Sequence, residues 1–384
     1  MWNGACMSRL RSFFRVPVLP VFLPPASRGG FFCSVYHDEG ESELDKKWLR
    51  WLAAPVAALM LAACGSADDS AEQPQNQDGE TEQQTADQGG KADQEATFPV
   101  TETDAVGNEI TLEKQPEKIV SMVPSNTEIL FAVGAGKAVV AGSDFDDYPE
   151  EAQKLEKIGG QEFNVEKIVG LQPDVVFAHE SALGVGEEGL QQLRDAGLTV
   201  FVVKNATDFD ETYGTIQQIG KLTGYSAEAE EIVSGMQDKV DEIKEKAEAV
   251  TDKKKVFVET SPAPDIYTPG SGTFMQQFLD IIHGENVAAD QQGWVMMDPE
   301  EIVNRNPDVI MVMYDYIDTA VEDVYSREGF DAVTAIKEKA VIQVDENITS
   351  RTGPRLAEGL EAVAKAVYPE IFGEAEQDEE DQAA

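Results

Sequence analysis

The sequence predicts an α/β protein made of two lobes of parallel sheet joined by a single long helix. Residues 164–178 (NVEKIVGLQPDVVFA) and 298–312 (DPEEIVNRNPDVIMV) align without a gap, and each reads as a short helix, a Pro-Asp turn and an apolar strand. Between them, the charged run 226–253 carries apolar side chains at every third or fourth position, which indicates one amphipathic helix. One αβ unit on either side of one helix implies twin lobes.

The stretch before the first lobe has the features of a leader. Lys46, Lys47 and Arg50 precede an apolar run that ends in LAAC at Cys64. A basic start, a short apolar centre and small residues before the break are typical of a secretory signal that is too short to span a bilayer. Segment 44–63 resembles a bacterial lipoprotein signal, which implies that Cys64 becomes the lipidated first residue of the mature protein.

Residues 1–43 do not fit this interpretation, because a signal peptide should open the chain. We interpret 1–43 as an extension that results from the choice of start codon, with translation beginning at Leu44. The mature protein would then keep only Cys64, which excludes disulfides and thiol chemistry. Residues 64–97 and 374–384 are polar and acidic, and we expect a disordered tether and a disordered tail there.

The chain is strongly acidic, with 72 acidic and 30 basic residues and a net charge of −42. Such a chain repels phosphate, which excludes nucleic acid as a partner. A solvated acidic surface of this kind also suits a saline or alkaline exterior.

The first lobe is predicted over residues 98–225. It opens with a hairpin over 100–112 that turns near Gly107. A capping box, Ser125-Asn126-Thr127-Glu128, is expected to start the first helix after Pro124. Further strands are expected at 119–123, 139–142 and 200–203, and further helices near 190–196 and up to Gly224.

The second lobe is predicted over residues 254–373, with Asp298 capping the helix of its αβ unit as Asn164 caps that of the first. Strands are expected at 255–259, 310–314 and 341–344, and helices at 274–283, 330–337 and 354–367. The loop SDFDDYPEE after the strand 139–142 is a strand-to-helix loop, where α/β lobes usually hold ligands.

Five segments together resemble the substrate-binding lipoproteins of ABC importers for vitamin B12, ferric siderophores and haem. These segments are VPSNTEILFAVGAG, SDFDDYPEEAQK, NVEKIVGLQPDVV, GWVMMDPEEIV and SRTGPRLAEGLEAVAKAVYP. The resemblance covers about residues 98–370. It implies two Rossmann-like lobes of the class III periplasmic-binding type and a monomer anchored by lipid at the outer face of the cell membrane. The implied partners are an ABC permease with its ATPase and a small chelate ligand.

The same resemblance implies that Glu166 and Glu300, one in each repeat, dock the permease. Two carboxylates near helix starts on separate lobes can form paired salt bridges with basic residues of a membrane partner. The alternative is that both merely stabilise exposed helix starts.

The resemblance also implies a ligand cleft lined with aromatic side chains. The candidate residues are Phe145, Tyr148, His179, Tyr267, Trp294 and Arg351. Phe145 and Tyr148 could equally pack within the lobe, and His179 could either ligate a metal in the ligand or donate a hydrogen bond. Arg351 is favoured over Arg355 for contact with anionic ligand oxygens, while Arg355 could form an ordinary surface pair.

The sequence contains few of the residues that competing classes of function require. After processing only His179 and His283 remain, with no nucleophile motif, so an enzyme is not expected, nor a resident cofactor or metal site. A free-metal binder usually gathers several histidines. A haem-binding or free-metal-binding importer lipoprotein and a purely structural surface lipoprotein stay as alternatives to a carrier of iron-siderophore or cobalamin, whose cargo would itself contain iron or cobalt.

Overall fold

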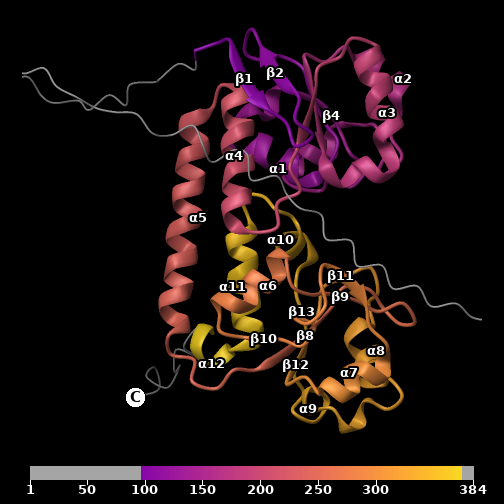
Figure 1. Ribbon diagram of the computed structural model, residues 1–384, viewed down its shortest axis with the longest axis vertical. Coiled ribbons are helices and arrows are strands. Elements are labelled where there is room, and N and C mark those ends of the chain that lie inside the picture. The colour runs from indigo at the N-terminus through magenta and orange to yellow at the C-terminus, as the bar shows by residue number, and fades with distance from the viewer. Residues whose placement is uncertain (1–96, 374–384) are drawn as a thin grey trace, which may run out of the picture. The chain divides into compact units, whose positions relative to one another are not determined.

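The computed structural model describes residues 97–373, and its first element is a hairpin (Figure 1). Strand β1, Val100–Thr103, pairs antiparallel with β2, Glu109–Leu112. The turn is held by Asp104, whose Oδ1 accepts hydrogen bonds from the backbone N–H groups of Val106 (3.1 Å) and Asn108 (2.7 Å). The predicted hairpin is therefore confirmed. The predictions for the leader, for Cys64 and for the acidic tail lie outside the described residues.

The first sheet has its strands in the order β5-β4-β3-β6-β7, and every pairing is parallel. Its strands are β3 (Ile119–Ser121), β4 (Val139–Gly142), β5 (Glu156–Lys157), β6 (Val175–His179) and β7 (Val200–Val203). Because β3 comes first in the chain yet lies between β4 and β6, the strand order reverses there. Ligands of open parallel sheets bind beyond the carboxyl ends of the strands at such a reversal.

Seven helical segments accompany this sheet within the described residues. They are α1 (Pro124–Ala132), η1 (Ala135–Ala138), η2 (Glu150–Lys154), α2 (Val165–Leu171), η3 (Glu180–Ala182), α3 (Leu183–Asp195) and α4 (Phe209–Thr223). Helix α3 begins well before the predicted 190–196. Helix α4 ends at Gly224, which has the left-handed backbone that stops a helix without steric cost.

The predicted capping box at the start of α1 is wrong. The N-cap is Val123, no side chain caps the helix, and Pro124 occupies the first turn, where its missing N–H costs nothing. Ser125 is consequently inside the helix, and Glu128 is free to bind elsewhere. In the first repeat the expected cap is confirmed, because Asn164 Oδ1 accepts from the Lys167 N–H at 2.9 Å. Asp298 occupies the equivalent N-cap position but makes no side-chain cap bond, so that part of the prediction is wrong.

The long helix α5 spans Ser226–Ala247 and ends before the predicted boundary at residue 253. The N–H groups of Glu248 and Ala249 bond to carbonyls three residues back, so the helix tightens into a turn. The β-branched Val250 and Thr251 then favour leaving the helix. One face of α5 is buried, and it consists of Ala229, Val233, Met236, Val240, Ile243 and Ala247.

The second sheet is also parallel, with strand order β10-β8-β12-β13. Its strands are β8 (Lys255–Glu259), β10 (Glu285–Asn286), β12 (Val309–Val312) and β13 (Val341–Gln343). The sequence did not predict the separate antiparallel ribbon of β9 (Tyr267–Pro269) and β11 (Trp294–Met296), because three-residue strands carry too little alternation to be recognised.

The helices of this half are α6 (Phe274–Ile281), α7 (Pro299–Arg305), α8 (Ala320–Tyr325), η4 (Phe330–Ala332), α9 (Thr334–Lys337), α10 (Glu346–Ser350), α11 (Leu356–Val367) and α12 (Pro369–Phe372). The helix predicted at 330–337 is divided at Val333, which has extended backbone. None of the helices between residues 97 and 373 combines the length and apolar character that a membrane crossing requires.

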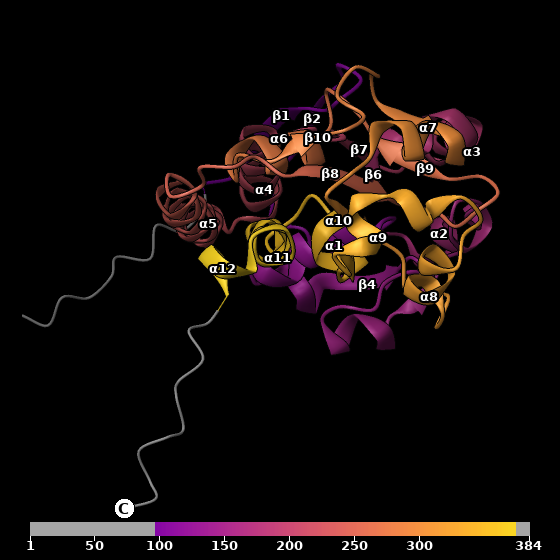
Figure 2. The ribbon, with the colours of Figure 1, turned by 90° about the horizontal axis from the view of Figure 1, so that it is seen from below.

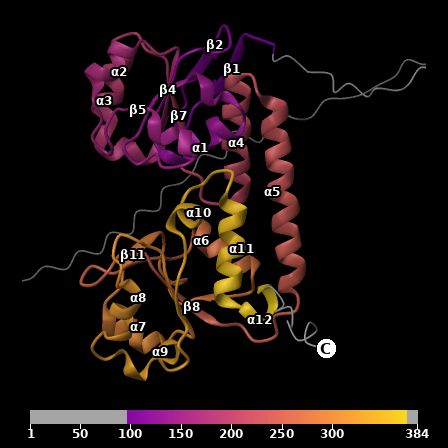
Figure 3. The ribbon, with the colours of Figure 1, turned by 180° about the vertical axis from the view of Figure 1, so that it is seen from behind.

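One apolar cluster runs through both lobes. It contains Phe177 and Phe201 of the first sheet, Val258 of the second, and the buried face of α5. In the view of Figure 2, α5 and α11 are both seen nearly end-on, so they run along a common direction, and Lys239 of α5 pairs with Glu361 of α11 at 2.5 Å. Figure 3 shows α11 between α5 and the second sheet. The lobes therefore share a core along the helices that join them.

We expect Gly220→Ala to destabilise the protein, because α4 and α5 touch at this glycine. A methyl group there would lie 2.4 Å from Ala229 Cβ and 2.9 Å from the Tyr225 carbonyl oxygen. Overpacking of this kind should lower the free energy of unfolding by about 1–3 kcal/mol in urea denaturation. Gly214→Ala on the same helix is the matched control. It meets nothing within 4 Å and should stabilise by roughly 0.5–1 kcal/mol, so equal effects of the two variants would contradict the proposed packing.

Candidate functional site

The carboxyl ends of the strands in the first sheet enclose a cavity of about 360 Å³. Its walls come from the loops that follow β3, β4, β5 and β6. They are Met122, Val123, Pro124, Ser143, Phe145, Gly160, Gln161, Phe163, Ser181, Ala182 and Val185. Of the residues predicted to contact a ligand, Phe145 lies in this cavity, with 58% of its surface exposed. An apolar cavity at the reversal of strand order has the position and the lining expected of a ligand site.

The β9–β11 ribbon presents an exposed apolar face. Tyr267 stands opposite Met296 in the antiparallel register, and Trp294 lies two residues before Met296, so the three side chains share one face. They are 44%, 57% and 48% exposed, respectively. The Trp294 ring also contacts the Phe274 ring at 6.0 Å between centroids. The structure thus places the two predicted residues, Tyr267 and Trp294, on one surface and adds Met296 to it.

Tyr316 is a second candidate that the sequence analysis missed. It follows the carboxyl end of β12, is 64% exposed, and lies against Tyr314 with 5.4 Å between ring centroids. Met296 carried only a weak signal, because the three-residue segment Trp294-Val295-Met296 shows too little alternation to identify a strand. Tyr316 carried no such signal, because its significance depends on where β12 ends.

A buried ion pair fixes the strand ends beside Tyr316. Glu259, the last residue of β8, is fully buried and accepts two hydrogen bonds of 2.8 Å from Arg327. The Tyr314 hydroxyl donates to the same carboxylate at 2.9 Å, and burial raises the pKa of that tyrosine. A buried charge that is fully paired in this way ties the segment after β12 to β8.

His179 is not among the residues that line the first cavity. Only 6% of the residue is exposed, and its Nδ1 accepts from the Ser181 hydroxyl (2.8 Å) and from the Ser181 N–H (3.3 Å). Burial lowers the pKa of His179 to about 4, so the imidazole is neutral at physiological pH. The observed role of the side chain is to cap the segment that carries Ser181 and Ala182.

The remaining two predicted ligand residues, Tyr148 and Arg351, each contact charged side chains. Tyr148 faces a larger cavity of about 780 Å³ that Phe145 does not line, and the guanidinium carbon of Arg355 lies 3.8 Å from its ring centroid. Arg351 Nη1 donates to Glu128 (2.8 Å) and Asp147 (2.5 Å). Arg355 is not in a surface pair, because its partner is the buried Glu128.

Glu166 and Glu300 are both exposed, and each lies in the first turn of its helix, α2 and α7. Figures 1 and 3 show these two helices on the side of the fold away from α5. The part of the chain that the structure describes contains no group of three or more His, Cys, Asp or Glu side chains that could hold a metal ion.

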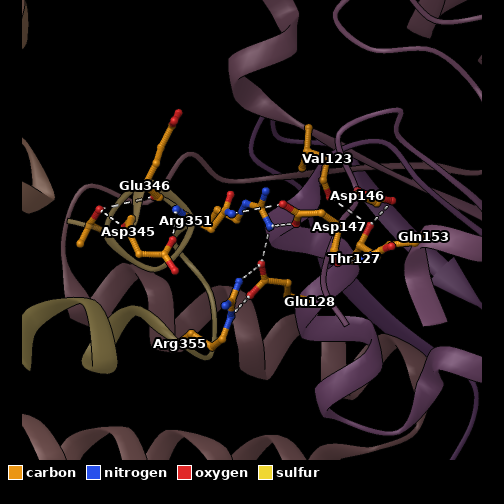
Figure 4. Close-up of polar contacts among 12 residues, drawn as sticks. Val123, Thr127, Glu128, Asp146, Asp147, Gln153, Asp345, Glu346, Arg351 and Arg355 are labelled. Carbon is orange, nitrogen blue, oxygen red and sulfur yellow. Dashed lines mark hydrogen bonds and ion pairs between the residues drawn. The ribbon is translucent and has the colours of Figure 1, made fainter. Parts of the chain in front are cut away.

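Asp146 is a buried carboxyl group in the loop after β4. It is 3% exposed, and its Oδ2 accepts from the Thr127 hydroxyl at 2.9 Å (Figure 4), while Oδ1 has no hydrogen-bond partner. Burial raises the pKa of Asp146 to about 6, against the opposing effects of Thr127 and Lys157. The protonated carboxyl group of Asp146 therefore favours the folded state. This contribution to stability is lost as the pH rises from about 4 through 6.

Asp146→Asn should consequently become more stable relative to the wild type as the pH rises from 4 to 8. The expected gain in the free energy of unfolding over this range is roughly 1–3 kcal/mol, since the variant cannot ionise. Urea denaturation at several pH values measures it. Glu151→Gln, which removes an exposed charge from the same region, should show no such trend, and a pH-independent difference between Asp146→Asn and the wild type would contradict the burial argument.

The comparison with known proteins agrees with this geometry. The sequence profile described as periplasmic binding protein matches residues 119–348. An ABC transporter substrate-binding lipoprotein of Bacillus subtilis, YvrC, is 42% identical over 326 residues, which cover 84% of this chain and 98% of the relative. A cobalamin-binding protein of Halobacterium salinarum is 34% identical over 290 residues, covering 72% of this chain and 76% of the relative.

Solved structures show the same architecture. A possible iron-binding, periplasmic solute-binding protein of Staphylococcus epidermidis is 35% identical, with a TM-score of 0.61 over 66% of this chain and 100% of that one. The periplasmic haem-binding protein RhuT of Roseiflexus is 25% identical, with a TM-score of 0.61 over 66% and 98% of the two chains. The predicted two-lobed α/β fold is thus confirmed. The chain belongs to the periplasmic binding protein family, the substrate-binding components of ABC transporters.

Proposed function

We propose that this protein captures a ferric siderophore or a cobalamin-type ligand between its lobes and delivers it to an ABC permease. The observation that carries the proposal is the set of exposed apolar side chains at the loop ends of both lobes: Phe145 on the first, and Tyr267, Trp294, Met296 and Tyr316 on the second. Large rings with few rotatable bonds supply contact area and stacking for a flat or aryl-rich chelate at low entropic cost.

The names of relatives support this class of ligand without choosing within it. Cobalamin-binding, iron-binding and haem-binding proteins all occur among them. Haem is the less favoured alternative here, because the neutral His179 is buried and its Nδ1 is already engaged. A free-metal carrier is disfavoured by the lack of a metal-ligand cluster among residues 97–373.

Arg351 remains a candidate for contact with anionic ligand oxygens. Both of its hydrogen bonds come from Nη1, so within the described residues Nη2 has no hydrogen-bond partner. His179 and Tyr148 contribute by supporting their loops, His179 through its hydrogen bonds with Ser181 and Tyr148 through its contact with Arg355.

We further propose that the mature protein is a monomer anchored at the outer face of the cell membrane through lipidated Cys64. The support is the lipoprotein-like signal before Cys64 and the name of the Bacillus subtilis relative. The role of the family is to bind solutes for transport, and catalysis is not part of the proposal.

Calorimetric titration of the full chain tests the ligand class. The probes are cyanocobalamin, haemin, ferric enterobactin and ferrichrome, and one of them should bind. Trp294→Ala should then weaken binding by about tenfold to a hundredfold, because it removes the largest exposed ring of the ribbon. Val106→Ala, at an exposed apolar position on the β1–β2 turn, should leave the affinity unchanged. Binding of none of the four probes would sink the proposal and favour a structural surface lipoprotein.

Permease docking has its own test. The double variant Glu166→Ala, Glu300→Ala should reduce uptake in cells at least tenfold while the Kd for the probe changes less than twofold, because both carboxylates lie on exposed helix starts. The matched control is Glu188→Ala, Glu322→Ala, which removes one exposed charge from each lobe. Unchanged uptake in the first double variant would show that these carboxylates do not dock the permease.

A further inference from the structure

A buried carboxylate of the first lobe is held by two arginines of the second. Glu128 of α1 is 3% exposed. It accepts from Arg351 Nη1 at 2.8 Å and from Arg355 Nε and Nη2 at 2.9 and 2.7 Å, as Figure 4 shows. Two guanidinium groups on one carboxylate satisfy its lone pairs, and this makes burial of the charge tolerable.

The neighbouring loop of the first lobe joins the same group. The Asp147 carboxylate accepts from Arg351 Nη1 at 2.5 Å and from Asn347 Nδ2 at 3.1 Å. Tyr148 stacks on the Arg355 guanidinium at 3.8 Å. Every one of these contacts joins the loop after β4 to the segment from α10 to the start of α11.

The two carboxylates differ in their access to solvent. The Glu128 side chain is 2% exposed and that of Asp147 is 47% exposed. Partial burial opposes ionisation of Asp147, but the hydrogen bond and charge of Arg351 outweigh it and hold the pKa of that carboxyl below its usual value. The Glu128 contact is therefore shielded from solvent, whereas the Asp147 contact is open to solvent, salt and competing anions.

We propose that Glu128, Asp147, Tyr148, Asn347, Arg351 and Arg355 form an interlobe clamp that positions the loop 143–149 against the second lobe and fixes the separation of the lobes. This inference rests on the proposed function only where it concerns ligand affinity. The connection is direct, because Phe145 of the candidate ligand cavity lies in the same loop, two residues before Asp147.

Distance measurements without ligand test the clamp. In the full chain with Cys6, Cys33 and Cys64 replaced by Ser, spin labels are attached to Gln192→Cys on α3 and Glu322→Cys on α8, two exposed positions on different lobes. Double electron–electron resonance should give a single narrow distribution of distances between the two spin labels in this background. Asp147→Asn should broaden it, and Glu128→Gln should broaden and shift it further.

Glu151→Gln is the matched control, since it removes an exposed carboxylate from the same region that has no ion pair among the described residues. Its distribution should match that of the labelled background. Superimposable distributions for Asp147→Asn, Glu151→Gln and the background would overturn the clamp. If Glu128→Gln does not fold, the half-exposed Asp147 still decides the question.

Ligand affinity supplies a readout that a purely structural role would not change. The probe is whichever of cyanocobalamin, haemin, ferric enterobactin and ferrichrome the wild type binds. Asp147→Asn should weaken its binding by about tenfold if only one molecule in ten keeps the loop 143–149 in the conformation that binds ligand. Its urea midpoint should stay that of the wild type, and Asp147→Glu should restore most of the affinity. Unchanged affinity in Asp147→Asn would refute the positioning role. If no probe binds the wild type, the proposed function fails, while the distance measurements still judge the clamp.

Discussion

The structure depends on one continuous apolar core that passes from lobe to lobe along α4, α5 and α11. Ring contacts carry it across the junction, because Phe209 at the start of α4 stacks on Phe278 of α6 with 5.6 Å between centroids. The Phe209 N–H also donates to Gln277 Oε1 at 2.8 Å. Buried apolar area and satisfied polar groups together join the two lobes along these helices.

The charged side chains fall into two groups, those exposed to solvent and those buried within the fold. The chain carries a net charge of −42, and most of its carboxylates can remain in water. Among the described residues, the buried Glu128 and Glu259 are each paired with arginine, whereas the buried Asp104 and Asp146 accept hydrogen bonds from backbone N–H groups and from the Thr127 hydroxyl, respectively. In a protein with few basic residues, these arginines identify the places where the fold requires a paired buried charge.

The two aromatics of the loop after β4 illustrate how a single segment can serve two purposes. Phe145 lines the candidate ligand cavity, and Tyr148 lies on Arg355 at the junction of the lobes. One short loop therefore contributes both to the candidate ligand cavity and to the contact between the lobes. The Glu259–Arg327 pair gives the second lobe a comparable support beneath Tyr314 and Tyr316.

The sequence alone determined the twin αβ units, the parallel sheets and the joining helix. These follow from periodic burial and turn chemistry, which are local properties of the chain. It could not determine that Glu128 binds two arginines instead of capping α1, or that Tyr148 and Phe145 line different cavities. Nor could it determine that Met296 and Tyr316 belong to the exposed apolar surface. Arg351 and Arg355 lie 223 and 227 residues from Glu128, and only tertiary folding brings such distant groups within hydrogen-bond range and decides which charges must be buried together.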